Sequence, residues 1–317
     1  MNKKWFIILY IITAVILISA ITVLSVLLIN KSKPVQTLKP VTFYEWLGFI
    51  KETVYQTPDG VYYAFEPDEL MVYSLKDYSG TVFVTPDEID GHKVTVFLEK
   101  ALVGNETIET LILSDNIRII DFDLYNKVGT LKSVFIGAGA KEIMSGMFMN
   151  CTNLEQVTVD VRNPYYYSEN NAIIRKKDHC LICSSPGMNE IPSTASVIGE
   201  ISFMNSERKE ICIPENIVKI EKDAFSYCKA LTAVFIPSSV VEIEECIFEF
   251  SKNEKDAPLT VFCESAEKPE NWADNWYCVV EYEQGDVFSQ EMNDRFVTVH
   301  WGATREEYDD FIRSLKP

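Results

Sequence analysis

Residues 211–248 repeat one pattern with a shift of 23 residues. The positions that return in phase carry the same residue types, and they are Ile213-Pro214 with Ile236-Pro237, Ile220 with Ile243, and Phe225 with Phe248. A fixed period of roughly 20–30 residues is typical of a solenoid, because each turn buries its apolar face only by stacking on the next turn. The repeat therefore predicts a mainly β solenoid.

The same frame extends back through earlier turns of the chain. Each turn offers two alternating apolar positions typical of a strand, and these are Leu111/Leu113, Val134/Ile136, Val157/Val159 and Val234/Ile236. A bulky position follows later in each turn, filled by Leu102, Tyr125, Phe148, Phe203, Phe225 and Phe248. We expect every turn to hold an alternating strand, a Pro or Ser turn, a second short strand and a tight helical or 3₁₀ corner.

The residue types within one turn resemble a known family. Residues 213–231 read Ile-Pro-x-x-Ile-x-x-Ile-x-x-x-Ala-Phe-x-x-Cys-x-x-Leu, a pattern similar to that of BspA-type leucine-rich repeat proteins of bacterial surfaces. Residues 87–94 resemble the first turn of this family, residues 159–187 a hairpin insertion, and residues 263–276 its closing turn. The chain departs from the pattern at Val128 and Ser251, where Cys is expected, and at Gly137-Ala138, where Pro is expected.

The N-terminal segment predicts a membrane anchor. Residues 5–29 carry no charge, and a helix of this length rises roughly 37 Å at about 1.5 Å per residue, enough to cross a bilayer. Ile18 fits badly with signal cleavage after Ala20, so we expect an uncleaved signal-anchor with residues 1–4 as a cytoplasmic tail. Lysines flank both sides almost equally. The resemblance implies the orientation: a single-pass protein of the bacterial plasma membrane with extracytoplasmic repeats.

The remaining boundaries follow from turn and helix signals. Residues 30–40 are predicted to be a linker, 41–85 an N-terminal cap, 86–263 the solenoid with a hairpin insertion at 160–187, and 264–317 a C-terminal cap with a tail helix. In the N-terminal cap, Thr42 and Glu45 form a capping-box signal. Apolar residues at helical spacing follow it, namely Trp46, Leu47, Ile50 and Val54. This predicts a short helix before the first strands.

Composition and motifs argue against several functions. The formal net charge of −18 argues against a nucleic-acid partner, which needs a cationic surface. No metal, cofactor or catalytic constellation is predicted, and we expect a protein that is not an enzyme. Cys180 and Cys183 form the one redox-like motif, on a predicted strand where residues three apart face opposite sides. Cys263 and Cys278 flank the predicted Trp-rich cap and are a candidate disulfide.

One row of residues lies between the inward positions of the strands. Because side chains alternate along a strand, the row should face outward, and its candidate partner-binding members are Ile112, Phe135, Cys212, Phe235 and Phe262. Thr158 is the polar member of this row. Two explanations remain open: an exposed apolar strip that binds a partner, or β-forming residues covered by neighbouring segments.

These observations predict a membrane-anchored surface protein that binds rather than catalyses. The resemblance implies attachment to host or matrix proteins or to other cells, so an extracellular protein or glycan is the expected partner. A structural envelope protein without a discrete ligand is the alternative. A thiol oxidoreductase that uses Cys180 and Cys183 is the remote alternative.

Overall fold

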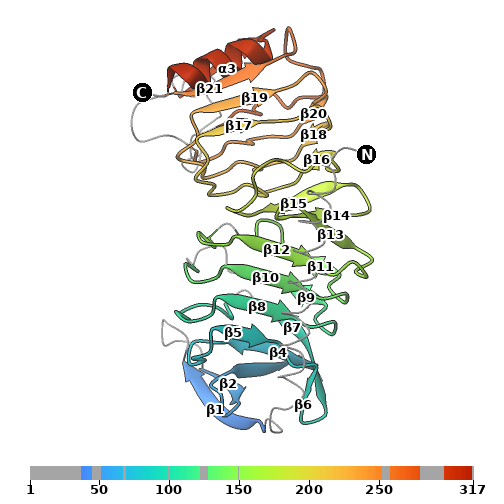
Figure 1. Cartoon of the computed structure of the whole chain (residues 1–317), viewed down its shortest axis with the longest axis vertical. Coiled ribbons are helices and arrows are strands. Elements are labelled where there is room, and N and C mark those ends of the chain that lie inside the picture. Colours follow the sequence, from blue (N-terminus) through green and yellow to red (C-terminus); the bar gives the residue numbers. More distant parts are fainter. Residues whose placement is uncertain are drawn as a thin grey trace, which may run out of the picture.

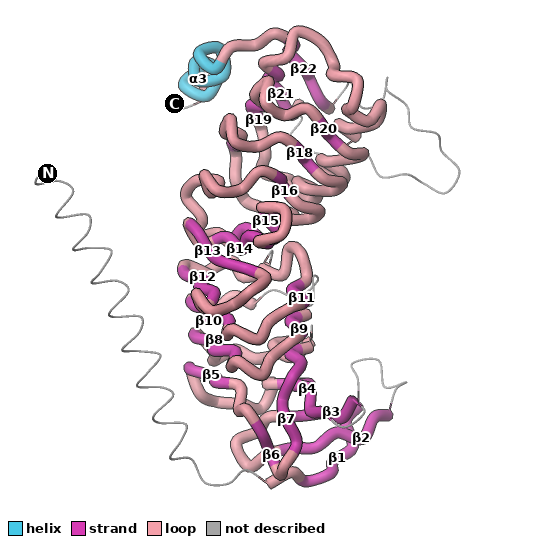
Figure 2. Tube along the Cα trace, turned by 90° about the vertical axis from the view of Figure 1, so that its right-hand side faces the viewer, coloured by secondary structure: helices cyan, strands magenta, loops and turns pink. Residues whose placement is uncertain are grey.

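The computed structural model describes residues 37–44, 51–66, 69–98, 100–121, 128–148, 150–251, 258–278 and 296–315. These residues form an elongated, mainly β solenoid with one helix against its C-terminal end (Figures 1 and 2). The predicted membrane anchor at 5–29 lies outside the described residues. Within the described ranges, no helix has both the length and the apolar character that a membrane span requires.

Two stacks of parallel strands build the N-terminal half. The first stack contains β5 (Val82–Val84), β8 (Thr110–Leu113), β10 (Ser133–Ile136) and β12 (Gln156–Val159). The second contains β4 (Glu69–Ser74), β7 (His92–Phe97), β9 (Ile119–Ile120) and β11 (Glu142–Ile143). Leu111 pairs with Val134, which pairs with Val157. This register confirms the phase of the sequence repeat.

The C-terminal half repeats this arrangement. Its first stack contains β17 (Glu210–Cys212), β19 (Ala233–Ile236), β21 (Leu259–Cys263) and β22 (Val297–Trp301). Its second contains β16 (Val197–Ile198), β18 (Lys219–Ile220) and β20 (Glu242–Ile243). Past the last repeat, Trp272 and Trp276 are buried, and the Trp276 ring lies 6.4 Å from that of Phe248. These indoles cover the apolar end of the solenoid.

An antiparallel sheet separates the two halves. It consists of β13 (Tyr166–Glu169), β14 (Ala172–Arg175) and β15 (Cys180–Ser184), and β15 then pairs parallel with β16. One face of this sheet places Ile173 and Ile182 in the N-terminal core, whereas the other places Ile174 and Leu181 in the C-terminal core. The insertion sheet lies between the two halves (Figure 1). It is therefore a wall whose two sides are both apolar.

The predicted N-terminal cap helix is wrong in the part that the structure describes. The chain there forms β1 (Lys39–Tyr44) and β2 (Lys51–Gln56), which pair antiparallel and continue into β3 (Tyr62–Glu66). Thr42 lies in β1 opposite Thr53, and Val54 lies in β2 opposite Val41. β-Branched and aromatic residues favour such pairing, and tertiary pairing overrides a local capping signal. Trp46, Leu47 and Ile50 lie outside the described residues.

The corners of the repeats are turns rather than the helical or 3₁₀ turns that we expected. Asp223 and Tyr227 have positive φ angles of 56° and 58°, which interrupt any helical hydrogen-bond series. The N–H groups of Phe225 and Tyr227 donate instead to the next turn, at 2.8 Å and 2.9 Å. The corner backbone therefore adds hydrogen bonds between turns. Repeated bonding of this kind holds successive corners in register.

In several corners a small polar side chain satisfies buried backbone groups. Asn105 Nδ2 donates to the carbonyls of Leu75 and Tyr78 at 2.7 Å and 2.9 Å. Ser251, which departs from the family pattern, accepts a hydrogen bond from the N–H of Cys228 at 2.9 Å, and its hydroxyl donates to a carbonyl at 2.7 Å. Cys, Asn and Ser are interchangeable at this slot because each can serve buried backbone groups that would be costly to leave unpaired.

Candidate functional site

The predicted outward row occupies neighbouring strands as its spacing implies. Cys212 pairs with Phe235, and Phe235 pairs with Phe262, across β17, β19 and β21. Ile112 and Phe135 pair in the same way across β8 and β10. The row is therefore split between the two halves of the solenoid, with the insertion sheet between its parts.

Helix α3 (Arg305–Ser314) covers the C-terminal part of the row. Its residues Tyr308 and Phe311 place their rings 5.7 Å and 5.3 Å from the ring of Phe262. Phe262 is only 6% exposed and Phe235 only 2%. The prediction that these two rings form an exposed binding strip is therefore wrong, and the covered alternative holds. Strand alternation identifies the outward face but not the segment that packs on it.

The predicted tail helix is present and begins with a capping box. Thr304 caps its first turn: the Thr304 hydroxyl accepts a hydrogen bond from the N–H of Glu307, and the Glu307 carboxylate accepts one from the N–H of Thr304 at 2.7 Å. Arg305 in this turn donates a hydrogen bond to the sulfur of Cys212 and lies 5.7 Å from the centre of the Phe235 ring. Helix α3 therefore contacts three adjacent strands of the sheet.

In the N-terminal part of the row, the exposure of the side chains differs from residue to residue. Ile112 is 3% exposed, so it is also buried, whereas Phe135 is partly exposed. Thr158 is likewise partly exposed on β12. Of the aromatic residues in the row, only Phe135 keeps part of its ring accessible. The prediction that Ile112 is exposed is therefore also wrong, whereas the binding role assigned to Phe135 and Cys212 stays a prediction.

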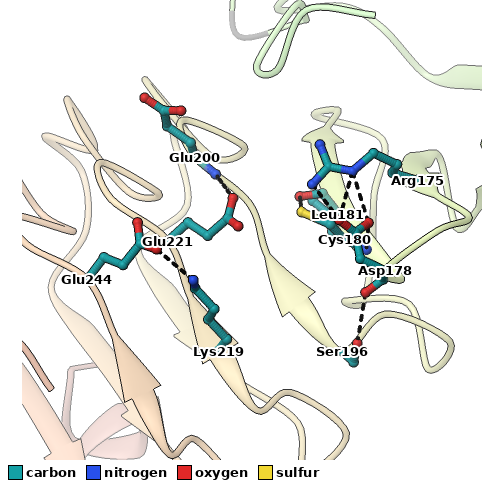
Figure 3. Close-up of polar contacts among 9 residues, drawn as sticks. All are labelled: Arg175, Asp178, Cys180, Leu181, Ser196, Glu200, Lys219, Glu221 and Glu244. Carbon is teal, nitrogen blue, oxygen red and sulfur yellow. Dashed lines mark hydrogen bonds and ion pairs between the residues drawn. The ribbon is translucent and has the colours of Figure 1, made fainter. Parts of the chain in front are cut away.

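The Cys180-x-x-Cys183 motif lies in the interior of the insertion sheet. Both sulfurs belong to the N-terminal core, because a register shift opposite Ile173 turns Cys183 to the same side as Cys180. Figure 3 shows Cys180 beside the Arg175–Asp178 ion pair, whose Nη2 and Oδ2 atoms are 2.8 Å apart. Burial raises the pKa of Cys180 to about 12 and that of Cys183 further. Buried protonated thiols are poor nucleophiles, and nothing here supports a thiol oxidoreductase.

The predicted Cys263–Cys278 disulfide is not formed, and all eight cysteines are free thiols. Cys263 belongs to the C-terminal core. The thiol next to Cys278 is instead Cys246, and the N–H groups of both donate to the carbonyl of Asn275, at 3.2 Å and 3.1 Å. Hydrogen bonding to Cys278, together with burial, raises the pKa of Cys246 strongly.

A cavity at the junction of the two halves was not predicted from the sequence. Its volume is about 460 Å³, and we call it the junction cavity. Three parts of the chain line it: Phe148 with Thr152, residues between 184 and 189, and residues 204–208. Its polar side chains are Thr152, Ser184, Ser185, Asn189, Asn205, Ser206, Glu207 and Arg208. Asn205 donates a hydrogen bond to the side chain of Asn150 at 2.9 Å, which links corners that are 55 residues apart.

Arg208 supplies the positive charge of this cavity. Its side chain is partly buried, and one guanidinium nitrogen donates to the carbonyl of Met188. No carboxylate in the described part of the chain forms an ion pair with it, and burial lowers its pKa. The arrangement combines the partly buried cation of Arg208 and the exposed carboxylate of Glu207 with hydroxyl and amide groups. The partly buried cation suits an anionic group of a polar ligand.

Two of the three histidines lie against aromatic rings in the described ranges. These ranges contain no group of three or more His, Cys, Asp or Glu side chains placed to hold a metal ion. His92 and His300 pack against Phe65 and Phe262, with ring centres 4.8 Å and 5.1 Å apart. These histidines therefore contribute to packing.

The sequence matches one family profile. The profile of the BspA type leucine rich repeat region aligns in six copies with residues 89–172 and 179–265, which together make up more than half of the 317 residues. A comparison with curated proteins finds no match.

A comparison with solved structures finds similar chains among bacterial proteins. A leucine-rich repeat protein of T. pallidum is 17% identical, covers 76% of this chain and 96% of its own, and has a TM-score of 0.34. The pneumococcal vaccine antigen PcpA is 14% identical, covers 80% of this chain and 89% of its own, and has a TM-score of 0.41. A leucine-rich repeat protein from Eubacterium ventriosum is 12% identical, with coverages of 80% and 99% and a TM-score of 0.30.

Proposed function

Because this chain belongs to the BspA-type leucine-rich repeat family, we propose that it is a bacterial cell-surface protein whose solenoid binds an extracellular protein or glycan. Proteins of this repeat type are often surface proteins. A stacked repeat offers a long surface on which separate turns contribute to one binding site. In this proposal the chain acts by attachment rather than by catalysis.

The uncharged run at residues 5–29 supports membrane attachment. Its length matches the apolar thickness of a bilayer, and a linker and the N-terminal cap separate it from the repeats. In the proposed arrangement, residues 1–4 are cytoplasmic and the solenoid is extracytoplasmic.

The observation that carries the binding proposal is the junction cavity. Ligand sites are concave and bring together a few polar groups, and this cavity brings together side chains from three segments of the chain. It lies where the regular stacking of turns is interrupted by the insertion sheet.

Whole cells provide the test of this proposal. Cells that express the full chain, and matched cells without it, are applied to arrays of immobilised extracellular proteins and glycans. Protease added to the intact cells is expected to remove the repeats and to abolish retention on the array. Repeats protected from protease would refute the topology. Equal retention of the two cell types on every spot would refute the binding role and favour a structural envelope protein.

A further inference from the structure

We infer that the junction cavity binds an acidic saccharide, with the sugar carboxylate held by the guanidinium of Arg208. This inference rests on the proposed binding function and specifies the chemical class of the ligand. It depends on the position of one cation and on the polar groups around it.

The first step of the argument is the state of the Arg208 side chain. It is partly buried in the cavity wall, and its guanidinium has the carbonyl of Met188 as its hydrogen-bond acceptor. A guanidinium has five N–H donors in a fixed planar fork, so most donors of Arg208 have no acceptor among the described residues. Glu207 also lines the cavity, but its side chain is exposed and forms no ion pair with Arg208 in the described ranges. A partly buried cation without an anion is costly, and a bound anion removes this cost.

The second step identifies the anion as a carboxylate. The planar fork of an arginine matches the two oxygens of a carboxylate and forms two parallel hydrogen bonds with them. The whole chain carries a formal net charge of −18, which repels anions from most of its surface. A ligand that approaches such a protein with a carboxylate therefore needs a local cation. Arg208 provides that cation inside a concave site.

The third step identifies the rest of the ligand as a sugar. The cavity wall is rich in short hydroxyl and amide side chains, and these are Thr152, Ser184, Ser185, Asn189, Asn205 and Ser206. Hydroxyl and amide groups donate and accept hydrogen bonds, so they match the many hydroxyl groups of a saccharide. The volume of about 460 Å³ lies within the range of small-molecule sites. Met204, which is partly exposed, adds apolar surface for a face of the sugar ring.

The test measures binding of digalacturonate to the full chain by titration calorimetry. Digalactose, which is neutral, and the acidic dipeptide Glu-Glu are the comparison ligands. We expect Arg208→Gln to weaken digalacturonate binding roughly 10–100-fold, the loss of hydrogen bonds to a charged group. Arg162→Gln is the matched control, because Arg162 is an exposed arginine that pairs with Asp115 and Asp160 outside the cavity.

A second variant separates loss of binding from loss of folding. Asn189 is exposed at the cavity wall, so Asn189→Trp is expected to fill the cavity and block the sugar while leaving Arg208 unchanged. The thermal unfolding midpoint of each variant is measured alongside binding. If Arg208→Gln does not fold, loss of binding in a folded Asn189→Trp variant still supports the inference.

Several results would overturn it. Digalacturonate binding that is unchanged in a folded Arg208→Gln or Asn189→Trp variant would place the ligand elsewhere. Equal binding of digalactose would remove the role of the carboxylate, and tighter binding of Glu-Glu would replace the sugar by an acidic peptide. If digalacturonate does not bind but cells that carry the chain are still retained on the arrays, this inference fails and the proposed function stands.

Discussion

Phe225→Ala tests whether the ladder of aromatic corner residues stabilises the C-terminal half. The Phe225 side chain is fully buried, at 0% exposed. Its ring lies between those of Phe203 and Phe248, with centres 5.2 Å and 5.6 Å away. The substitution therefore removes the middle ring of a continuous stack and leaves a cavity that no neighbouring side chain can fill without shifting.

The expected loss follows from this packing. Replacing a buried Phe by Ala costs about 3–5 kcal/mol, from lost transfer free energy and the cavity left behind. Each aromatic pair adds about 0.5–1.5 kcal/mol beyond the buried area, so we expect a loss of about 4–5 kcal/mol. With a urea dependence of about 2 kcal/mol per molar, the unfolding midpoint should fall by roughly 2 M.

Urea unfolding of the full chain, followed by tryptophan fluorescence and far-UV circular dichroism, measures this loss. Trp272 and Trp276 lie in the same core as Phe225, so the fluorescence midpoint should report the C-terminal half. Tyr227→Ala is the matched control at the same corner. The Tyr227 ring is 39% exposed and stacks on Phe250 at 4.6 Å, so its loss should cost less than about 1.5 kcal/mol.

Two outcomes would refute this reasoning. An unchanged midpoint for Phe225→Ala would mean that the repeat frame places the wrong residue in the core. Equal losses for Phe225→Ala and Tyr227→Ala would mean that corner geometry, rather than burial, determines stability. A larger shift by fluorescence than by circular dichroism is expected, because the N-terminal half has its own core.

Three further perturbations follow from the buried contacts. Phe262→Asp should release α3, because it places a charge at a site that is only 6% exposed and that packs against the helix. Amide hydrogen exchange in the helix should then become faster, and unchanged protection of these amides would contradict this. Oxidation by diamide, which takes two electrons and two protons from two thiols, should join Cys246 to Cys278, and peptide mapping that finds Cys263 joined to Cys278 would contradict this. Burial, and then the charge of Asp223, raise the pKa of Glu249 from its usual 4.5 to about 7, so the folded state keeps a proton that the unfolded state loses. Stability should therefore fall as the pH rises from about 4.5 to about 7, and Glu249→Gln should flatten this dependence in urea midpoints; an equal slope in both proteins would be inconsistent with it.

The stacked turns could be predicted from the sequence because their contacts are periodic. Leu111, Val134 and Val157 face the same core and pair with one another in register. When a residue packs against its own equivalent in the next turn, the constant separation of 23 residues identifies the two contacting residues. The solenoid and the inward-facing positions of its strands can therefore be predicted from the sequence alone.

The N-terminal cap could not be predicted in this way. Its capping-box signal at Thr42 is local, whereas the pairing of Val41 with Val54 depends on the segment that follows. Local propensity is a weak guide where tertiary pairing decides the outcome. The corner conformation was missed for the same reason, since its N–H groups bond to the next turn rather than within the corner.

The cover over the outward row was missed because it comes from a distant segment. Cys212 and Arg305 are 93 residues apart in sequence and lie in contact. The amphipathic pattern of α3 predicts a helix with one apolar face, but not the surface that this face covers. The junction cavity shows the same limit, because Asn150 and Asn205 meet across a spacing of 55 residues that breaks the repeat.

The insertion sheet affects the order in which the chain can fold during synthesis. All strands of the N-terminal stacks precede residue 160, yet the core that they form also includes Ile173, Cys180 and Ile182. While the ribosome has made only the N-terminal repeats, Val157 and Val159 at their end lack this apolar cover. Because a solenoid turn is stabilised by its neighbours, the nascent N-terminal half completes its core only after β15 has left the exit tunnel.

Emergence of the same strand prepares the start of the second half. Leu181 faces the C-terminal core, and β15 pairs directly with β16. The first C-terminal turn therefore meets a formed template as it is synthesised, instead of waiting for the turns that follow it. The N-terminal core is completed, and the C-terminal core is started, by the same strand, β15. The folding of the two cores is therefore linked in time, although no repeat belongs to both.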